Sequence, residues 1–356
     1  MKRLVYFTLA ISLLIMGLFG INQSLNRSTK QAGTSSLTIY NWGDYIDPSL
    51  IKEFEEEFNL RVIYETFDSN EAMYTKVKQA GTNYDLLIPS EYMIERMIEE
   101  DLLYKLDKNQ IIGMEHLLPD LLDLSFDPGN DYSIPYFWGT LGIIYNDRLI
   151  SEDAIRSWGD LWNPSYENQV LLIDGAREIV GLTLQSLGYS LNSKDLDALD
   201  EAKSKLDDLA PNVKAIVADE IKMYMIQEEG QIAVSFSGEA ADMIAENEHL
   251  HYLLPEEGSN LWFDSMVIPK TAQNIEGAHD FISFILRPEN AAQNAEYIGY
   301  SSPNQSAIEN EIDPELVADE QFYPDLSALD HLEVYENLSL DYVDLYNEIF
   351  LKFKMK

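Results

Sequence analysis

From residue 37 to about residue 99, short apolar runs alternate with segments whose apolar residues recur at helical spacing. Residues 37–40 predict a strand, and Asp47-Pro48 marks a helix start because an acceptor side chain precedes a proline in the first turn. Apolar residues continue at helical spacing to Phe58. The alternation repeats, with strands predicted at 61–66 and 84–89 and helices at 71–79 and from 91 onwards. This order predicts an α/β domain with a mostly parallel sheet flanked by helices, in which ligands lie at the carboxyl ends of the strands.

The pattern restarts after a long apolar run at 133–145, which predicts a strand that crosses between two domains. Further strands are predicted at 170–173, 231–236 and 251–254, and helices at 178–187 and 195–209. A chain of 356 residues is long enough for two such domains, each burying a core of its own.

The first 35 residues differ from the rest of the chain. Lys2 and Arg3 precede an apolar stretch at 4–21, which is about the length needed to span the hydrocarbon of a membrane. No A-x-A cleavage site follows, so an uncleaved membrane anchor at 1–21 is favoured over a cleaved signal peptide. Residues 22–35 are polar and predict a flexible linker. The remaining chain is then expected at the extracellular face of the cell membrane.

The charge balance narrows the class of partner. The chain has 24 Lys and Arg against 62 Asp and Glu, a net charge of -38. The negative field of such a chain repels phosphate backbones and concentrates small cations. Nucleic acid is therefore not an expected partner, whereas a cationic ligand is expected. Solubility alone would explain the acidic surplus equally well. The absence of cysteine excludes disulfides, thiolate metal sites and cysteine nucleophiles.

No catalytic motif is found in the sequence. Of the five histidines, His249 and His251 have a spacing that would place both on one face of a strand, but a surface strand is favoured over a metal site. Residues 235–238 resemble a nucleophile elbow, yet Val234 stands where its first glycine belongs. Residues 127–131 have the spacing of a Pro-Gly turn and not of a calcium-binding loop. We therefore predict no enzyme, no metal and no cofactor.

Aromatic and acidic residues occur together at the ends of predicted strands. The clusters are Trp42-Gly43-Asp44-Tyr45, Ser90-Glu91-Tyr92, Asp174-Gly175-Ala176-Arg177-Glu178 and Trp262-Phe263-Asp264. Each cluster alone is more typical of core and solvated surface than of a ligand site. Together they fit a linear polyamine, because each ammonium needs a carboxylate and each methylene run needs an apolar face that also attracts cations.

At these residues the chain resembles the spermidine/putrescine-binding proteins of bacterial ABC transporters. The resemblance runs from about residue 36 to the C-terminus and includes 40–45, 64–74, 133–139, 174–178, 261–265 and 298–300, in order. It implies a two-lobed periplasmic-binding-protein-like fold, with the polyamine in the cleft between the lobes. The first lobe would comprise 36–139 and 263–308, and the second 140–262 and 309–356.

The resemblance also implies the residues of the site. Aromatic walls would be formed by Trp42, Tyr45, Tyr92, Phe236, Trp262 and Tyr300. Asp44, Glu178 and Asp264 would pair with ammonium groups, and Ser90 would be a polar contact. Three positions differ from those of relatives. Phe236 stands where relatives can have a tryptophan, and Gly175 stands where some have an additional acid. Tyr335 falls near a position where relatives can have a glutamine that contacts an amine.

The expected function is therefore capture of spermidine or putrescine and its delivery to an ABC permease that a cytoplasmic ATPase drives. The receptor is expected to act as a monomer. The alternative is a receptor of the same fold for another small solute, such as an amino acid or a metal complex. An anionic or zwitterionic ligand would need a basic residue in the cleft, and Arg177 is the one basic residue in the four clusters.

Overall fold

The computed structural model describes residues 36–79, 82–151, 154–218, 220–319, 323 and 331–356. The predicted membrane anchor and linker lie outside the described residues. Within the described part of the chain, none of the helices combines the length and the apolar character that crossing a membrane requires.

The first lobe begins with the alternating order that the sequence predicts. Strands β1 (Ser36–Trp42), β2 (Arg61–Phe67) and β3 (Leu86–Leu87) pair in parallel, in the order β2-β1-β3. Helices α2 (Pro48–Phe58), α3 (Asn70–Lys78) and α4 (Glu91–Glu99) separate or follow them. The Asp47 side chain caps α2 by accepting from the Ser49 backbone N–H, as the Asp-Pro pair indicates. The predicted strands and helices of this part are confirmed.

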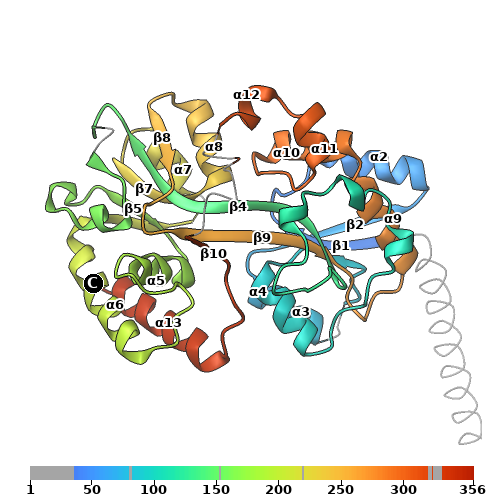
Figure 1. Ribbon diagram of the computed structural model, residues 1–356, viewed down its shortest axis with the longest axis horizontal. Helices are drawn as coiled ribbons and strands as arrows, with labels where there is room; N and C mark the ends of the chain where they lie inside the picture. Colours follow the sequence, from blue (N-terminus) through green and yellow to red (C-terminus); the bar gives the residue numbers. More distant parts are fainter. Residues whose placement is uncertain (1–35, 80–81, 152–153, 219, 320–322, 324–330) are drawn as a thin grey trace, which may run out of the picture.

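Two long strands join this sheet to the second lobe. They are β4 (Ser133–Asn146), which is buried throughout, and β9 (Ser259–Val267). The two strands pair antiparallel, with Trp138 opposite Phe263 and Gly139 opposite Trp262. Figure 1 shows both running across the middle of the molecule. The crossing strand at 133–145 is confirmed, and β9 is a second crossing strand that the hydrophobic pattern did not predict.

The second lobe repeats the arrangement on the other side of the crossing strands. Strands β7 (Ile232–Phe236) and β8 (Leu250–Leu253) pair antiparallel with β4, whereas β5 (Val170–Ile173) pairs in parallel with β7 and with β6 (Val213–Val217). Its helices are α5 (Ala176–Gln185), α6 (Leu196–Leu209), α7 (Glu220–Ile226), α8 (Ser237–Glu246) and the C-terminal α13 (Leu340–Lys354). Single 3-10 turns at Trp158–Trp162, Pro164–Tyr166 and Ala210–Asn212 connect them.

The chain then returns to the first lobe before it ends in the second. The returning elements are α9 (Ile275–Ile285), α10 (Pro288–Ile298), α11 (Gln305–Asn310) and α12 (Pro314–Val317). Short 3-10 turns at Lys108–Gln110, Met114–His116 and Pro119–Leu121 also belong to the first lobe. A third passage between the lobes follows β10 (Leu332–Glu333), which pairs with β9. We call residues 333–337 the crossing segment.

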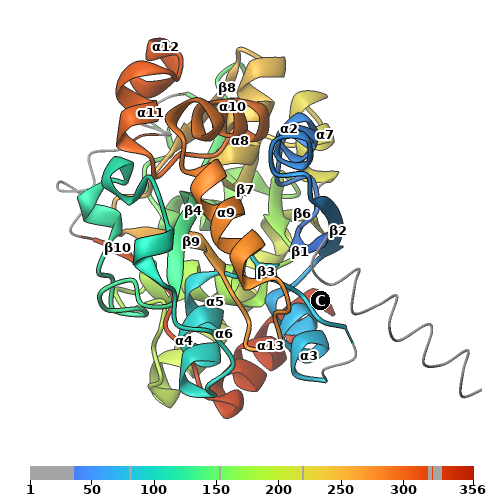
Figure 2. The ribbon, with the colours of Figure 1, turned by 90° about the vertical axis from the view of Figure 1, so that its right-hand side faces the viewer.

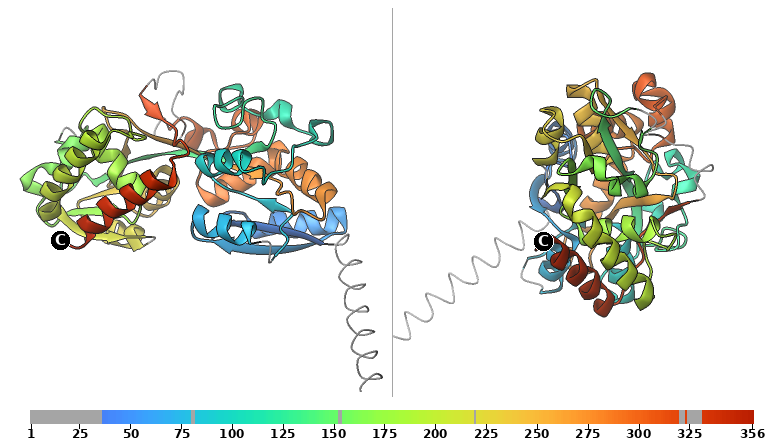
Figure 3. Two further views of the ribbon diagram at one scale, coloured as in Figure 1. Left: turned by 90° about the horizontal axis from the view of Figure 1, so that it is seen from below. Right: turned by 90° about the vertical axis from the view of Figure 1, so that its left-hand side faces the viewer.

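The buried apolar residues form separate cores. One core combines residues between 141 and 253 with α13. Two others combine residues between 37 and 138 with residues between 262 and 312, and they lie on opposite faces of the first sheet, under α2 and α9 and under α3 and α4. Figure 2 looks onto this lobe with α9 in front, and Figure 3 shows the lobes side by side. The two-lobed α/β fold is thus the observed architecture.

The turn before β4 is organised by one buried carboxylate. Asp127 accepts hydrogen bonds from the backbone N–H groups of Asp131, Tyr132 and Ser133, at 3.2, 3.0 and 2.8 Å. The Ser133 hydroxyl donates a fourth bond of 2.7 Å. These donors use the lone pairs of the Asp127 carboxylate, so this aspartate is a structural residue of the turn.

We expect Asp127→Ala to lower the free energy of unfolding by about 2–4 kcal/mol, because it leaves several buried donors without an acceptor. Urea denaturation measures this loss. Asp120→Ala removes an exposed acid nearby and should change the stability by less than about 0.5 kcal/mol. Equal effects of the two substitutions would contradict the assignment.

Candidate ligand-binding site

The candidate site collects residues from the ends of strands and the starts of helices in both lobes. Trp42 ends β1, Ser90 precedes α4, and Tyr92 lies in the first turn of α4. Trp262 and Asp264 lie in the crossing strand β9, and Tyr300 follows α10. The second lobe contributes Phe236 at the end of β7 and Glu178 in the first turn of α5. Each parallel strand directs its carboxyl end toward the same edge, so residues distant in sequence meet there.

Asp264 is the acid at the centre of this site. It is 6% exposed, and its two carboxylate oxygens accept hydrogen bonds from the Tyr45 hydroxyl at 2.7 Å and the Ser90 hydroxyl at 2.6 Å. Burial raises the pKa of Asp264 to about 6, although both hydrogen bonds favour the ionised form. Among the residues that the structure describes, no Lys, Arg or His forms an ion pair with it. The carboxylate is therefore buried with neutral donors alone.

Aromatic rings surround this carboxylate. Tyr45 and Tyr300 have ring centroids 5.6 Å apart, and Tyr300 and Trp262 have centroids 5.0 Å apart with nearly perpendicular planes. The ring centroids of Phe236 and Trp262 are 6.1 Å apart, so both lobes contribute rings to this cluster. Phe236 and Tyr300 are partly exposed, which leaves aromatic surface accessible beside Asp264.

Two glycines allow the rings to lie directly on the backbone. A Cβ atom at Gly139 in β4 would stand 2.6 Å from the Trp262 ring, and one at Gly238 in α8 would stand 2.1 Å from the Tyr300 ring. Both separations are too short for real atoms, so any larger residue would displace a ring of the site. The close approach of β4 and α8 thus fixes where Trp262 and Tyr300 lie.

A second group of the predicted site residues, Tyr92 and Glu178, lies in the first turns of α4 and α5. The Tyr92 hydroxyl accepts from the Asn70 side chain at 3.0 Å and lies 3.3 Å from the Glu71 carboxylate. Glu178 is partly buried, and burial raises its pKa, while the neighbouring Arg177 guanidinium acts in the opposite direction. This group therefore contains a second acid whose charged form is costly.

The structure does not bring every predicted residue to these two acids. Asp44 is exposed in the turn after β1 and forms no hydrogen bond or ion pair with the residues described by the structure. The Trp42 ring packs at 4.5 Å on Phe67 in the first lobe. Both residues lie at the carboxyl end of β1, and neither is a hydrogen-bond partner of Asp264, whose side chain bonds to Tyr45 and Ser90.

One buried acid beneath the site was not singled out by the sequence. Glu91 is 0% exposed, and its carboxylate accepts from the Phe263 backbone N–H at 2.9 Å. Burial raises the pKa of Glu91 to about 8. Glu91 lies between Ser90 and Tyr92 in one of the clusters, but its burial depends on the contact with β9, which the hydrophobic pattern did not predict.

Arg177 does not provide a free guanidinium for an anionic ligand. Its two terminal nitrogens donate to the Glu336 backbone oxygen at 2.9 Å and to the Asn192 side-chain oxygen at 2.8 Å. Because both nitrogens of the terminal fork are engaged, bidentate binding of a ligand carboxylate would require these bonds to break. The geometry does not favour the alternative of an amino-acid receptor.

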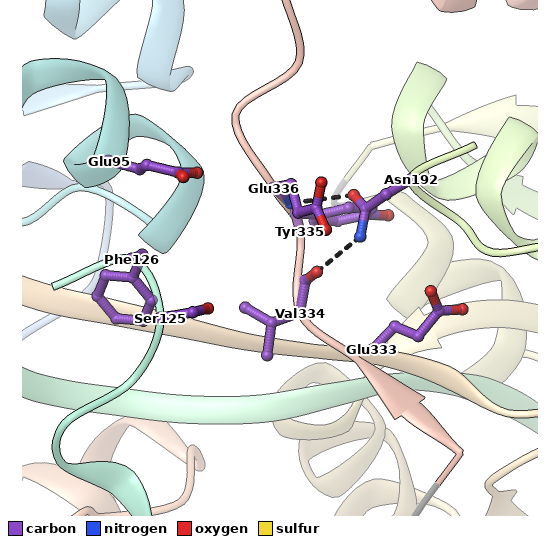
Figure 4. A pocket seen from close by; sticks show the side chains of 8 residues that line it. All are labelled: Glu95, Ser125, Phe126, Asn192, Glu333, Val334, Tyr335 and Glu336. Atoms are coloured by element: carbon purple, nitrogen blue, oxygen red, sulfur yellow. Dashed lines mark hydrogen bonds between the residues drawn. The ribbon is translucent and has the colours of Figure 1, made fainter. Parts of the chain in front are cut away.

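A cavity of about 350 Å³ lies against the crossing segment (Figure 4). The acids that line this cavity already have partners. The Glu333 carboxylate accepts hydrogen bonds from the Gln185 side chain and the Leu191 backbone N–H. The Glu95 carboxylate accepts from the Asn337 backbone N–H, and the Glu336 carboxylate lies 3.6 Å from the Lys194 ammonium. Asp264 is instead a buried acid that has no cationic partner among the described residues and has aromatic rings of both lobes around it, so we place the candidate site there.

The two histidines that share one face of a predicted strand contact one carboxylate. His249 and His251 each lie 3.0 Å from an oxygen of Asp147. In the described parts of the chain, no group of three or more His, Cys, Asp and Glu side chains has an arrangement that could hold a metal ion.

Two lobes joined by crossing strands, with a buried acid among aromatic rings contributed by both lobes, define a solute-binding protein of the type that captures small molecules for membrane transport. The chain belongs to the bacterial extracellular solute-binding protein family, whose model matches residues 49–324. This is a family of binding proteins and not of enzymes.

The chain is similar to several binding proteins over most of their length. A spermidine/putrescine-binding periplasmic protein of Salmonella typhimurium is 37% identical over 355 residues, which cover 99% of each chain. A putrescine-binding periplasmic protein of Pseudomonas aeruginosa, SpuD, is 30% identical and covers 78% of this chain and 80% of its own. The solved substrate-binding protein PotD of a spermidine/putrescine ABC transporter from Streptococcus pneumoniae is 58% identical, with a TM-score of 0.82, covering 90% of this chain and 99% of its own.

The raised pKa of Asp264 predicts a defined pH dependence of stability. Its pKa of about 6 in the fold exceeds its ordinary value of 3.8, so its favourable contribution is present below about pH 4 and is lost as the pH rises through 6. Asp264→Asn removes this loss. Between about pH 4 and pH 7.5, the stability of the variant should therefore rise relative to the ligand-free wild type by roughly 2–3 kcal/mol. Urea denaturation at several pH values measures the difference, and a difference independent of pH would contradict the assignment.

Proposed function

We propose that this protein captures a polyamine outside the cell and delivers it to an ABC permease. The observation that carries the proposal is the Asp264 carboxylate, which is buried among Tyr45, Trp262 and Tyr300 and has no cationic partner in the described structure. A buried carboxylate is stabilised most effectively by a cation, and an ammonium group in this position would also interact with the aromatic faces.

The proposed contacts follow the chemistry of the ligand. Asp264 and Glu178 pair with ammonium groups, Ser90 supports the Asp264 carboxylate, and the rings of Tyr45, Tyr92, Phe236, Trp262 and Tyr300 contact the methylene runs. Trp42 and Asp44 are proposed to contribute at the carboxyl end of β1, which requires that the lobes or the turn close around the ligand. The similarity to spermidine/putrescine-binding proteins of other bacteria supports this ligand class.

We propose the lobe boundaries 36–139 with 263–308 and 140–262 with 309–356. The separate cores support this division, except that α11 and α12 lie with the first lobe, where Ile312 packs with its core, which would move the last boundary beyond Val317. The protein would act as a monomer at the extracellular face of the membrane, held there by an uncleaved helix at residues 1–21. The permease would in turn be driven by a cytoplasmic ATPase.

Isothermal titration of the purified full-length protein with spermidine and putrescine tests the proposal. We expect one molecule bound per chain, and we expect Asp264→Asn to weaken binding by about 100-fold or more, because a charged, desolvated contact is worth 2–5 kcal/mol. Asp147→Asn removes an exposed acid of the second lobe and should leave the affinity within about twofold.

Two results would contradict the proposal. The first is the absence of binding to both polyamines while a panel of amino acids or metal complexes does bind. The second is polyamine binding that Asp264→Asn and Asp147→Asn weaken equally, since the total charge and not the buried acid would then hold the ligand.

A further inference from the structure

The protein places a cation of its own beside the predicted ligand acids. Arg177 is the second residue of α5 and directly precedes Glu178. Its guanidinium carbon lies 4.3 Å from the centroid of the Tyr335 ring and 5.2 Å from the centroid of the Tyr92 ring. Tyr92 belongs to the first lobe and Tyr335 to the crossing segment, so one cation covers two aromatic rings from different parts of the fold.

The position of this guanidinium is fixed by hydrogen bonds. Besides the bonds from its two terminal nitrogens to Glu336 and Asn192, the Asn192 side chain also accepts from the Glu336 backbone N–H at 3.0 Å and donates to the Val334 backbone oxygen at 2.8 Å. A planar guanidinium held at both terminal nitrogens keeps its orientation better than a flexible ammonium would. Arg177 is therefore a constant feature of this end of the site.

Several acids lie near this end, among them Glu71, Glu91 and Glu178, and the charge of Arg177 acts to lower the pKa of both Glu91 and Glu178. The Glu178 carboxylate lies over Gly175, where a Cβ atom would stand 2.2 Å from its Oε2. Arg177 offsets part of the cost of ionising Glu178 through its charge. The space that a side chain at position 175 would fill is thus used by Glu178 itself, and no second acid stands beside it at that position.

We propose that Arg177 is a specificity-determining residue that takes the place of one ligand ammonium at the Tyr92 and Tyr335 end of the site. Its charge occupies the aromatic faces of Tyr92 and Tyr335 that a further ammonium would use, and it repels a further ammonium beside the one that pairs with Glu178. The site then discriminates against a polyamine whose third ammonium must reach this end, relative to a diamine. This inference rests on the proposed function, because it concerns the choice among polyamines.

The test compares the dissociation constants of putrescine and spermidine for the wild type and for Arg177→Met, using titration of the full-length protein. Removal of the guanidinium should raise the affinity for spermidine relative to putrescine by about tenfold or more, since a charge a few ångströms away at an effective dielectric constant near 20 has at least that effect. Arg177→Lys keeps the charge and should keep most of the wild-type ratio. The thermal midpoint of each variant confirms that it is folded.

A matched control separates the local effect from the loss of one positive charge. Arg148→Met removes an arginine of the same lobe that lies at the surface, 3.1 Å from Glu228, and should leave the ratio unchanged within about twofold. Equal weakening of both ligands in a folded Arg177→Met protein would overturn the proposal, because Arg177 would then only hold the crossing segment. A ratio unchanged from that of the wild type would overturn it too. If the wild type binds neither polyamine, it is the proposed function that fails.

Discussion

The burial of the Asp264 carboxylate is the constraint on which the site depends. An acid removed from water without a cation is costly, and the structure offsets part of this cost with two short hydrogen bonds from Tyr45 and Ser90. The remaining cost is expressed in the raised pKa of Asp264. A buried acid in the crossing strand β9 favours the binding of a cation at that point. The attraction between the cation and the carboxylate would offset the free-energy cost of burying the charge.

The fold provides what this arrangement requires. The antiparallel pair of β4 and β9 passes through both lobes, so Trp262 and Asp264 can face residues from either side. Gly139 and Gly238 bring the backbone of β4 and α8 close enough to fix the rings of Trp262 and Tyr300. The starts of α4 and α5 add Tyr92 and Glu178 at the other end. Rigid elements thus position the residues of the candidate site.

The individual strands and helices could be predicted from the sequence more completely than the way in which they pack together. The strand and helix order from 36 to 99 and the buried run of β4 follow directly from periodicity and capping, as at Asp47. Strand β9 was not predicted because its polar residues, Asn260 and Asp264, are buried and form hydrogen bonds with distant partners, which removes the usual alternation. Strand β6 is half-buried along its whole length and also lacks a clear pattern.

The site shows the same limit. Its aromatic and acidic clusters could be read from the sequence, but the hydrogen bonds that join Asp264 to Tyr45 and Ser90 span separations of 219 and 174 residues. Likewise, the contacts on which the proposed role of Arg177 rests join residues that are distant in the sequence, Tyr92, Asn192 and Tyr335. The burial of Glu91 depends on its contact with Phe263 in β9. Such tertiary contacts decide which members of a cluster are buried, and composition alone cannot.

The most direct test of the account is the proton linkage of ligand binding, measured by titrating putrescine at pH 6 in two buffers of different ionisation enthalpy. Glu91→Gln protein should be used, so that the buried carboxyl beneath the site does not contribute, and Glu91→Gln/Glu178→Gln protein measured beside it removes the contribution of Glu178, whose pKa is also raised. Because the pKa of Asp264 is about 6, binding of a cation should release roughly half a proton per chain at pH 6 and much less at pH 7.5. Binding at pH 6 without proton release would contradict the claim that the ligand ammonium is held by the buried Asp264 carboxylate.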